Sequence, residues 1–235
     1  MATRTRRAER REEPLSRERI VEAAIGILDA AGEGGLTFRV LAERLATGPG
    51  AIYWHVTGKD ELLAVATATV VADTVIADTV IGGPEVGGPA AATPQEAIRA
   101  LALRLFDAID AHPWIGTQLA RSPGQSPLLR VFEHLGRQVR VLGVPQAGRF
   151  TAASTLLNYI LGVGGQNAAN AHGQESEANR TEFLNTVSAA WASLDPDEYP
   201  FTRDVADQLR DHDDRVEFLA GIDLILAGIS ESKAG

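Results

Sequence analysis

Five side chains between residues 39 and 59 are hydrogen-bond donors gathered in a short stretch. Tyr53, Trp54 and His55 follow one another, and Lys59 stands four residues later. A phenol, an imidazole and an ammonium group can all donate to phosphate oxygens. Arg39 is the fifth, and a guanidinium can donate two parallel hydrogen bonds to the edge of a guanine. This set favours the binding of double-stranded DNA.

Each of the five also has a structural interpretation. Arg39 and Lys59 could be solvated helix charges, and His55 could be a surface histidine. Tyr53 or Trp54 could belong to the core, and we expect one of the two rings to face the first helix. Three large side chains in a row nevertheless point in three directions around a helix, which is unusual for a buried segment.

Short helices are predicted around these residues. Ser16 is a typical N-cap, and apolar residues at helical spacing follow it until Gly32, which should end the first helix. Gly34-Gly35 then provides a turn. Thr37 is the next cap, for a second helix over Phe38–Ala46.

A third, very short helix is predicted over Pro49–His55, because proline is well tolerated in a first helical turn. Two short helices joined by a tight glycine-containing turn form a helix-turn-helix. The second of them lies in the major groove with its first residues at the base edges. Pro49, Gly50 and Ala51 are therefore predicted to lie against DNA.

Most of the remaining chain is also predicted to be helical. Thr57 and Asp60 match a capping box for a fourth helix from about Lys59 to Val80, and residues 82–93 form a Gly/Pro-rich loop. Thr93 and Glu96 match another capping box, for a helix at 94–111. Further helices are expected at 114–120, 126–143, 145–170, 181–194, 204–209 and 216–229. No segment alternates with a period of two, so the predicted fold is all-α.

Charge is unevenly distributed along the 235 residues. The net charge is −9, yet residues 1–19 contain seven Arg and four Glu, and residues 64–235 hold all the excess acid. DNA would be attracted to the N-terminal third and repelled by the rest. We predict a mobile Arg-rich arm at 1–15, a helix-turn-helix DNA-binding domain at 16–63, and a helical ligand-binding and dimerisation domain at 64–235.

Composition and spacing argue against several other classes. The chain has no cysteine, so disulfides and thiolate metal sites are excluded, and its five histidines lack metal-ligand spacing. No run approaches the ~20 apolar residues of a membrane span, and none resembles a signal peptide. No catalytic triad, carboxylate pair or phosphate-binding glycine loop appears. We expect a soluble cytoplasmic protein without metal, cofactor or catalytic residues.

Three N-terminal segments together resemble the DNA-binding domain of the TetR (tetracycline repressor) family. They are Leu36–Ala46, Gly48–Val56 and Lys59–Leu63. The body resembles the tetracycline-repressor-type C-terminal domain through His112-Pro113-Trp114 and Gly221–Ile229. The resemblance implies a homodimer that binds a near-palindromic operator and releases it when a small ligand enters the body.

The resemblance also implies roles for single residues. Arg39 matches a position that can reach a base, and the other four donors match positions that hold the DNA backbone or a nearby base. One segment departs from the family pattern, because Gly48-Pro49-Gly50-Ala51 offers almost no side-chain hydrogen bonding. Arg39 would then carry much of the direct base recognition.

The effector is not expected to be tetracycline. Magnesium–tetracycline binding in the family relies on a histidine some way past the region that His112 matches. The corresponding stretch here, Gln118-Leu119-Ala120, contains no histidine.

The helices near 150–170 and 216–230 are the best candidates for a dimer interface, because two from each subunit make a two-fold four-helix bundle. Gly162, Gly164 and Gly165 would permit close helix approach there. The alternative is that both helices are ordinary core of a monomer. A ligand pocket should be mostly apolar with a few polar groups. Candidate lining residues, each of which could instead be structural, are Phe106, His112, Trp114, Gln118, Phe132 and Asn158.

The predicted function is a ligand-responsive, DNA-binding transcriptional repressor that binds a palindromic operator as a homodimer and is released by a small-molecule effector. One alternative is a transcriptional activator or a DNA binder without a ligand. Another, of a different class, is a helical small-molecule-binding protein or enzyme in which the N-terminal helices serve only for packing.

Overall fold

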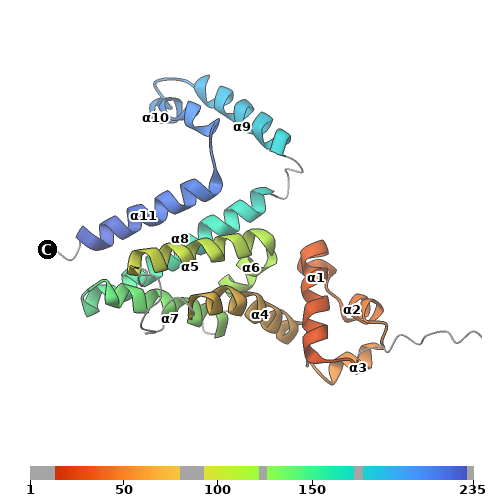
Figure 1. Ribbon diagram of the computed structural model, residues 1–235. Helices are drawn as coiled ribbons and strands as arrows, with labels where there is room; N and C mark the ends of the chain where they lie inside the picture. The colour runs from red at the N-terminus through yellow and green to blue at the C-terminus, as the bar shows by residue number, and fades with distance from the viewer. Residues whose placement is uncertain (1–13, 80–92, 122–125, 172–176, 232–235) are drawn as a thin grey trace, which may run out of the picture. The chain divides into compact units, whose positions relative to one another are not determined.

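The computed structural model describes residues 14–79, 93–121, 126–171 and 177–231 (Figure 1). Every regular element in these ranges is a helix, so the predicted all-α class is confirmed. Contacts divide the chain into two units, Met1–Ala66 and Thr67–Gly235. Most of the predicted arm at 1–15 and of the predicted loop at 82–93 lies outside the described residues.

The first unit consists of short helices around a shared apolar core. α1 spans Arg17–Gly35, α2 Phe38–Arg44 and α3 Pro49–Tyr53, and α4, Lys59–Thr79, begins in this unit. The predicted N-caps are confirmed, because the hydroxyls of Ser16 and Thr37 accept from the backbone N–H groups of Arg19 and Val40. The fully buried core side chains include Ile20, Ala24, Leu28, Leu41, Ile52, Val56 and Leu62.

One local prediction in this unit was confirmed and one was wrong. The regular part of α1 stops at Gly32 as predicted, because Gly32 has non-helical angles with a φ of 62°, and a short kinked extension reaches Gly35. The side chain that caps α4 together with Thr57 is Glu61 rather than Asp60. The backbone oxygen of Gly58 accepts the first helical hydrogen bond, from Leu62, so Glu61 occupies the third helical position, from which a carboxylate reaches back.

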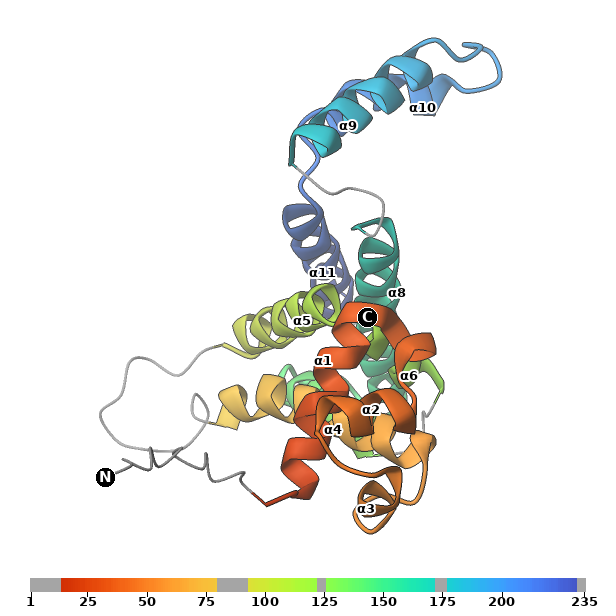
Figure 2. The same ribbon diagram turned by 90° about the vertical axis from the view of Figure 1, so that its right-hand side faces the viewer.

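The second unit is built around α8, Gln146–Ala171. α5 (Pro94–Ala111), α6 (Trp114–Arg121), α7 (Ser126–Val141) and α11 (Asp214–Glu231) all pack against it (Figure 2). The capping box predicted from Thr93 and Glu96 is confirmed at the start of α5. The buried core side chains include Leu101, Leu105, Ile109, Leu135, Leu156, Ile160, Phe218 and Ile222.

One of the three α8 glycines predicted to face a partner subunit instead packs inside its own chain. A Cβ on Gly164 would lie 3.1 Å from Ile109 Cδ1, so the missing side chain lets α5 approach α8 closely, which corrects the expected role of Gly164. Gly162 is exposed and Gly165 is half-buried, and an added Cβ at either would meet nothing within 4 Å.

A helical hairpin precedes α11 (Figure 1). It comprises α9 (Glu177–Ala192), α10 (Pro200–Asp204) and the 3-10 helix η1 (Ala206–Leu209), which pack on one another. Asp214, the first residue of α11, connects α11 to this hairpin. One of its carboxylate oxygens lies 2.7 Å from Arg180 of α9, and the other lies 3.0 Å from His212.

Candidate nucleic-acid interface and ligand pocket

Tyr53 and Trp54 lie at the surface of the first unit, at the end of α3. The Tyr53 side chain is 55% exposed and that of Trp54 is 90% exposed. The expectation that one ring belongs to the core was wrong, because Ile52 and Val56 take the buried positions on this segment. Large aromatic side chains that are this exposed to solvent are typical of surfaces that bind a partner.

Ring stacking holds Tyr53 in place. Its ring lies parallel to that of Phe38, with centroids 4.5 Å apart and an angle of 5° between the planes. Phe38 is the first residue of α2 and Tyr53 the last of α3, so the stack joins the beginning of one helix to the end of the other. It also fixes the start of α2, which carries Arg39 as its second residue.

Arg39 projects into solvent from the first turn of α2. Its side chain is 87% exposed, and its Nε donates to Glu43 Oε1 at 3.1 Å. His55, just beyond α3, is half-buried. Both cationic and aromatic candidates are thus accessible at least in part.

Lys59 has a structural partner that the sequence analysis did not foresee. Its Nζ donates to the backbone oxygen of Glu33 at 2.6 Å, which links the first residue of α4 to the last turn of α1. An ammonium group carries three N–H donors, so this bond leaves two for other acceptors.

The first turn of α3 presents backbone rather than polar side chains. Gly48, Pro49 and Gly50 are exposed, and Ala51 is half-buried. A Cβ added to Gly48 or Gly50 would meet nothing within 4 Å. This turn can approach a flat surface closely but cannot donate side-chain hydrogen bonds to it.

Glu61 connects the beginnings of α1 and α4. Its carboxylate accepts from the hydroxyl and the backbone N–H of Thr57, at 2.6 and 2.7 Å, and from Arg17 at 2.6 Å. These bonds, those from Thr57 first, lower the pKa of the carboxyl below its ordinary value. The network fixes where α4 leaves the helix-turn-helix.

Three contributors to this surface were missed from the sequence: Phe38, Glu43 and Glu61. The spacing of four residues between Arg39 and Glu43 is a signal that could have revealed that ion pair. The stack of Phe38 on Tyr53 depends on the angle between α2 and α3, which no local spacing encodes.

The six residues proposed from the sequence to line a ligand pocket are spread over four helices of the second unit and the α5–α6 junction. Phe106 is buried and stacks on Phe218 with centroids 4.6 Å apart. Trp114 is buried with its edge towards His112, and Phe132 lies edge-on to Phe150. Asn158 is exposed and Gln118 half-buried. Their role in ligand binding stays a prediction.

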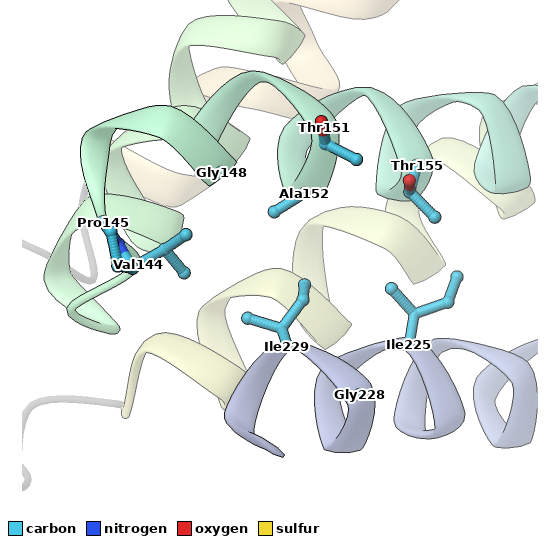
Figure 3. Close-up of a pocket in the computed structure, with 9 residues that line it drawn as sticks. All are labelled: Val144, Pro145, Gly148, Thr151, Ala152, Thr155, Ile225, Gly228 and Ile229. Carbon is cyan, nitrogen blue, oxygen red and sulfur yellow. The ribbon is translucent and has the colours of Figure 1, made fainter. Parts of the chain in front are cut away.

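A groove of about 540 Å³ lies between the first half of α8 and the second half of α11 (Figure 3). Apart from the hydroxyls of Thr151 and Thr155, its side chains are apolar. Its lining residues, none of which is among those six, are Val144, Pro145, Gly148, Thr151, Ala152, Thr155, Ile225, Gly228 and Ile229. Leu224, beside Ile225 on α11, is 76% exposed.

These features define a class of protein: an all-α chain in which a helix-turn-helix unit with an exposed aromatic and cationic surface is joined to a larger helical unit. The described residues contain no group of three or more His, Asp or Glu suited to a metal ion. None of the described helices is long and apolar enough to cross a membrane.

Comparisons with known proteins place the chain within this class. Residues 20–66 match the model for bacterial regulatory proteins of the tetR family, and residues 88–232 match that for the tetracyclin repressor-like C-terminal domain. The second match covers more than half of the sequence, so the chain belongs to the TetR family.

Individual relatives agree with this assignment. The structure of the transcriptional regulator SCO7222, a TetR from Streptomyces coelicolor, is similar with a TM-score of 0.80 and 59% identity, covering 93% of this chain and 99% of that one. The transcriptional repressor DrrR1 of Streptomyces coeruleorubidus is 29% identical over 77% of this chain, and an HTH-type transcriptional regulator of Saccharopolyspora erythraea is 26% identical over 63% of it. The chain spans 62% and 59% of the lengths of these two relatives.

Proposed function

We propose that this chain is a transcriptional repressor that binds a palindromic DNA operator as a homodimer and leaves it when a small-molecule effector binds the second unit. The observation that carries the proposal is the exposed surface formed by Tyr53, Trp54 and Arg39 on a helix-turn-helix. A regulator bound to bacterial DNA acts in the cytoplasm and needs no catalytic group.

We assign a separate role in DNA binding to each residue of this surface, based on its position. Tyr53, stacked on Phe38, presents its hydroxyl to a phosphate, and the Trp54 indole lies beside it. His55 and the free N–H groups of Lys59 add contacts to the backbone. Arg39 contacts a base edge, while Pro49, Gly50 and Ala51 allow the α3 backbone to approach the groove.

Dimerisation is assigned to α8 and α11. Both helices leave side chains uncovered: Thr151 and Thr155 of α8 line the groove of Figure 3 and are exposed, and Leu224 of α11, next to the groove residue Ile225, is also exposed. Two such helices from each subunit form a four-helix bundle with two-fold symmetry, which matches the symmetry of a palindrome. Docking of a second copy would cover the exposed Leu224.

The effector acts by preferring one of two conformations of the dimer. A coupling of ~1–3 kcal/mol would release DNA by roughly 5- to 150-fold. Our candidates for the pocket that binds this small molecule are Phe106, His112, Trp114, Gln118, Phe132 and Asn158.

The test begins with footprinting of the full-length protein on the DNA upstream of its own gene and the neighbouring genes, which should reveal one protected palindrome. In titrations with that duplex, Arg39→Ala should weaken binding roughly 5- to 150-fold. Tyr53→Phe, which keeps the ring stack and removes only the hydroxyl, should weaken it by roughly fivefold.

Arg137→Ala is the matched control, because Arg137 is also an exposed member of an ion pair but lies on α7. It should bind like the wild type. Unchanged affinity in both Arg39→Ala and Tyr53→Phe would contradict the assignment of this surface. An increase in transcription on DNA binding would favour the activator instead.

A further inference from the structure

Arg39 and Glu43 form an isolated pair on the exposed side of α2. The Arg39 Nε donates to Glu43 Oε1 at 3.1 Å, and the two side chains are 87% and 66% exposed. Within the described part of the chain, the terminal nitrogens of Arg39 and the second oxygen of Glu43 have no hydrogen-bond partner. The pair therefore presents two free donor nitrogens and one free acceptor oxygen together.

The stability of the fold does not account for this pair. Exposed ion pairs contribute little to folding, because water screens them and two long side chains must be ordered. A carboxylate beside the DNA backbone also repels phosphates and so weakens non-specific binding. A glutamate at this position has to be explained by something other than general affinity for DNA.

The position of the pair points to base recognition. Arg39 follows Phe38, whose ring is stacked on Tyr53 at the end of α3, so the start of α2 is fixed against the helix that enters the groove. The first turn of α3 consists of Gly48, Pro49, Gly50 and Ala51 and has no polar side chain. Polar recognition of bases then has to come from a neighbouring element, and α2 supplies it.

We propose that Glu43 is a positioning and specificity residue, which holds Arg39 through Nε so that the pair recognises one G·C base pair in each half-site. With Nε engaged, the two terminal nitrogens of the guanidinium are free to donate to O6 and N7 of guanine. The second carboxylate oxygen of Glu43 can accept from N4 of the paired cytosine. This inference rests on the proposed binding of an operator. It adds that each half of the operator contains a G·C base pair that the pair Arg39 and Glu43 recognises.

Selection from a randomised duplex library with the full-length protein tests the inference. The wild type should select a palindrome with an invariant G·C pair in each half. Its affinity for the selected duplex is then compared with that for a duplex in which this pair is A·T. For Glu43→Ala the ratio of the two affinities should fall by about tenfold, towards that of Arg39→Ala.

The conservative variant Glu43→Gln distinguishes the positioning of Arg39 by Glu43 from the effect of the negative charge of Glu43. Glu43→Gln keeps an oxygen that can accept from Arg39 Nε, so its affinity ratio should lie between those of the wild type and Glu43→Ala. Affinity for the A·T duplex should not fall in either variant, because a negative charge near the phosphates has been removed. Circular dichroism should show unchanged helix content, since Glu43 is exposed.

A matched control comes from α7, where Arg137 Nε lies 2.8 Å from Glu133 Oε1 and both side chains are 60% exposed. Glu133→Ala removes the same kind of pair and should leave the affinity ratio unchanged. The inference is overturned if Glu43→Ala keeps the wild-type preference or weakens both duplexes by one common factor. Failure of the wild type to select any sequence would overturn the proposed operator binding itself, and this inference with it.

Discussion

Trp54 is exposed to 90%, so its indole adds almost nothing to the packing of the unit that carries it. Its replacement can therefore change DNA affinity without changing the stability of the fold, whereas replacement of a half-buried residue would change both. We expect Trp54→Ala to weaken binding of the operator duplex by roughly tenfold, the loss of about one contact worth ~1.4 kcal/mol. Fluorescence anisotropy with a labelled duplex measures this.

The melting temperature of Trp54→Ala should stay at the wild-type value. Phe201→Ala provides the control, because Phe201 is 75% exposed but lies on α10. Equal effects of the two substitutions on DNA binding would show that loss of any exposed ring has the same consequence, and the specific role of Trp54 would be refuted.

The acid sensitivity of the first unit should depend on Glu61. Hydrogen bonds from Thr57, and then from Arg17, lower its folded-state pKa below the ordinary 4.5. A lowered pKa gives stability that is fully present above the unfolded-state value and is lost as pH falls through the folded-state value. Glu61→Gln should therefore be less stable than the wild type at pH 7, and the difference should shrink below about pH 4.5. Thermal melts at both pH values test this, and an unchanged difference would contradict it.

Among the elements, α1 contains a backbone conformation that strongly restricts its sequence. Gly32 has a φ of 62° and a ψ of −172°, a combination that is nearly confined to glycine and costs other residues about 1–3 kcal/mol, whereas Gly34 has open space around it and no positive φ. Gly32→Ala should lower the free energy of unfolding by about 1–3 kcal/mol. Gly34→Ala should be neutral or slightly stabilising in the same denaturant titration. The same loss in both would indicate a general intolerance of this turn.

Local sequence signals predicted several of the helix caps correctly. Ser16, Thr37 and Thr93 were correctly identified as caps, because each capping bond spans only three residues. The exact partner of Thr57 was missed, since choosing between Asp60 and Glu61 depends on which residue first becomes helical. The packing role of Gly164 could not be foreseen, because it depends on α5 meeting α8.

For the residues proposed to face DNA, the sequence indicates chemical types but not contacts. The exposure of Tyr53 and Trp54 follows from Ile52 and Val56 taking the core positions, and this choice is made only when α3 packs. The bond from Lys59 to Glu33 and the stack of Phe38 on Tyr53 join residues far apart in the sequence. Spacing alone carries no information about them.

At the scale of the whole molecule, the proposed binding of a palindrome depends on the association of two subunits. We expect Leu224→Glu to convert the proposed dimer to a monomer, because Leu224 is 76% exposed and next to the groove residue Ile225 in α11, and a buried unpaired carboxylate would oppose association. Analytical ultracentrifugation gives the mass directly. Palindrome binding should weaken in parallel, because a monomer contacts only one half-site.

Leu129→Glu controls for added negative charge, since Leu129 is 56% exposed on α7. It should remain dimeric. Dimers of undiminished stability in Leu224→Glu would show that a different face joins the subunits.

The empty space around Gly48 and Gly50 makes this protein suited to retargeting. Neither position has a positive φ, and a Cβ added at either would meet nothing within 4 Å. Asn or Gln introduced there would bring the amide group that pairs with the edge of adenine. A library confined to these two codons could therefore yield repressors with new promoters, and natural divergence of the regulated genes would face a similarly low barrier.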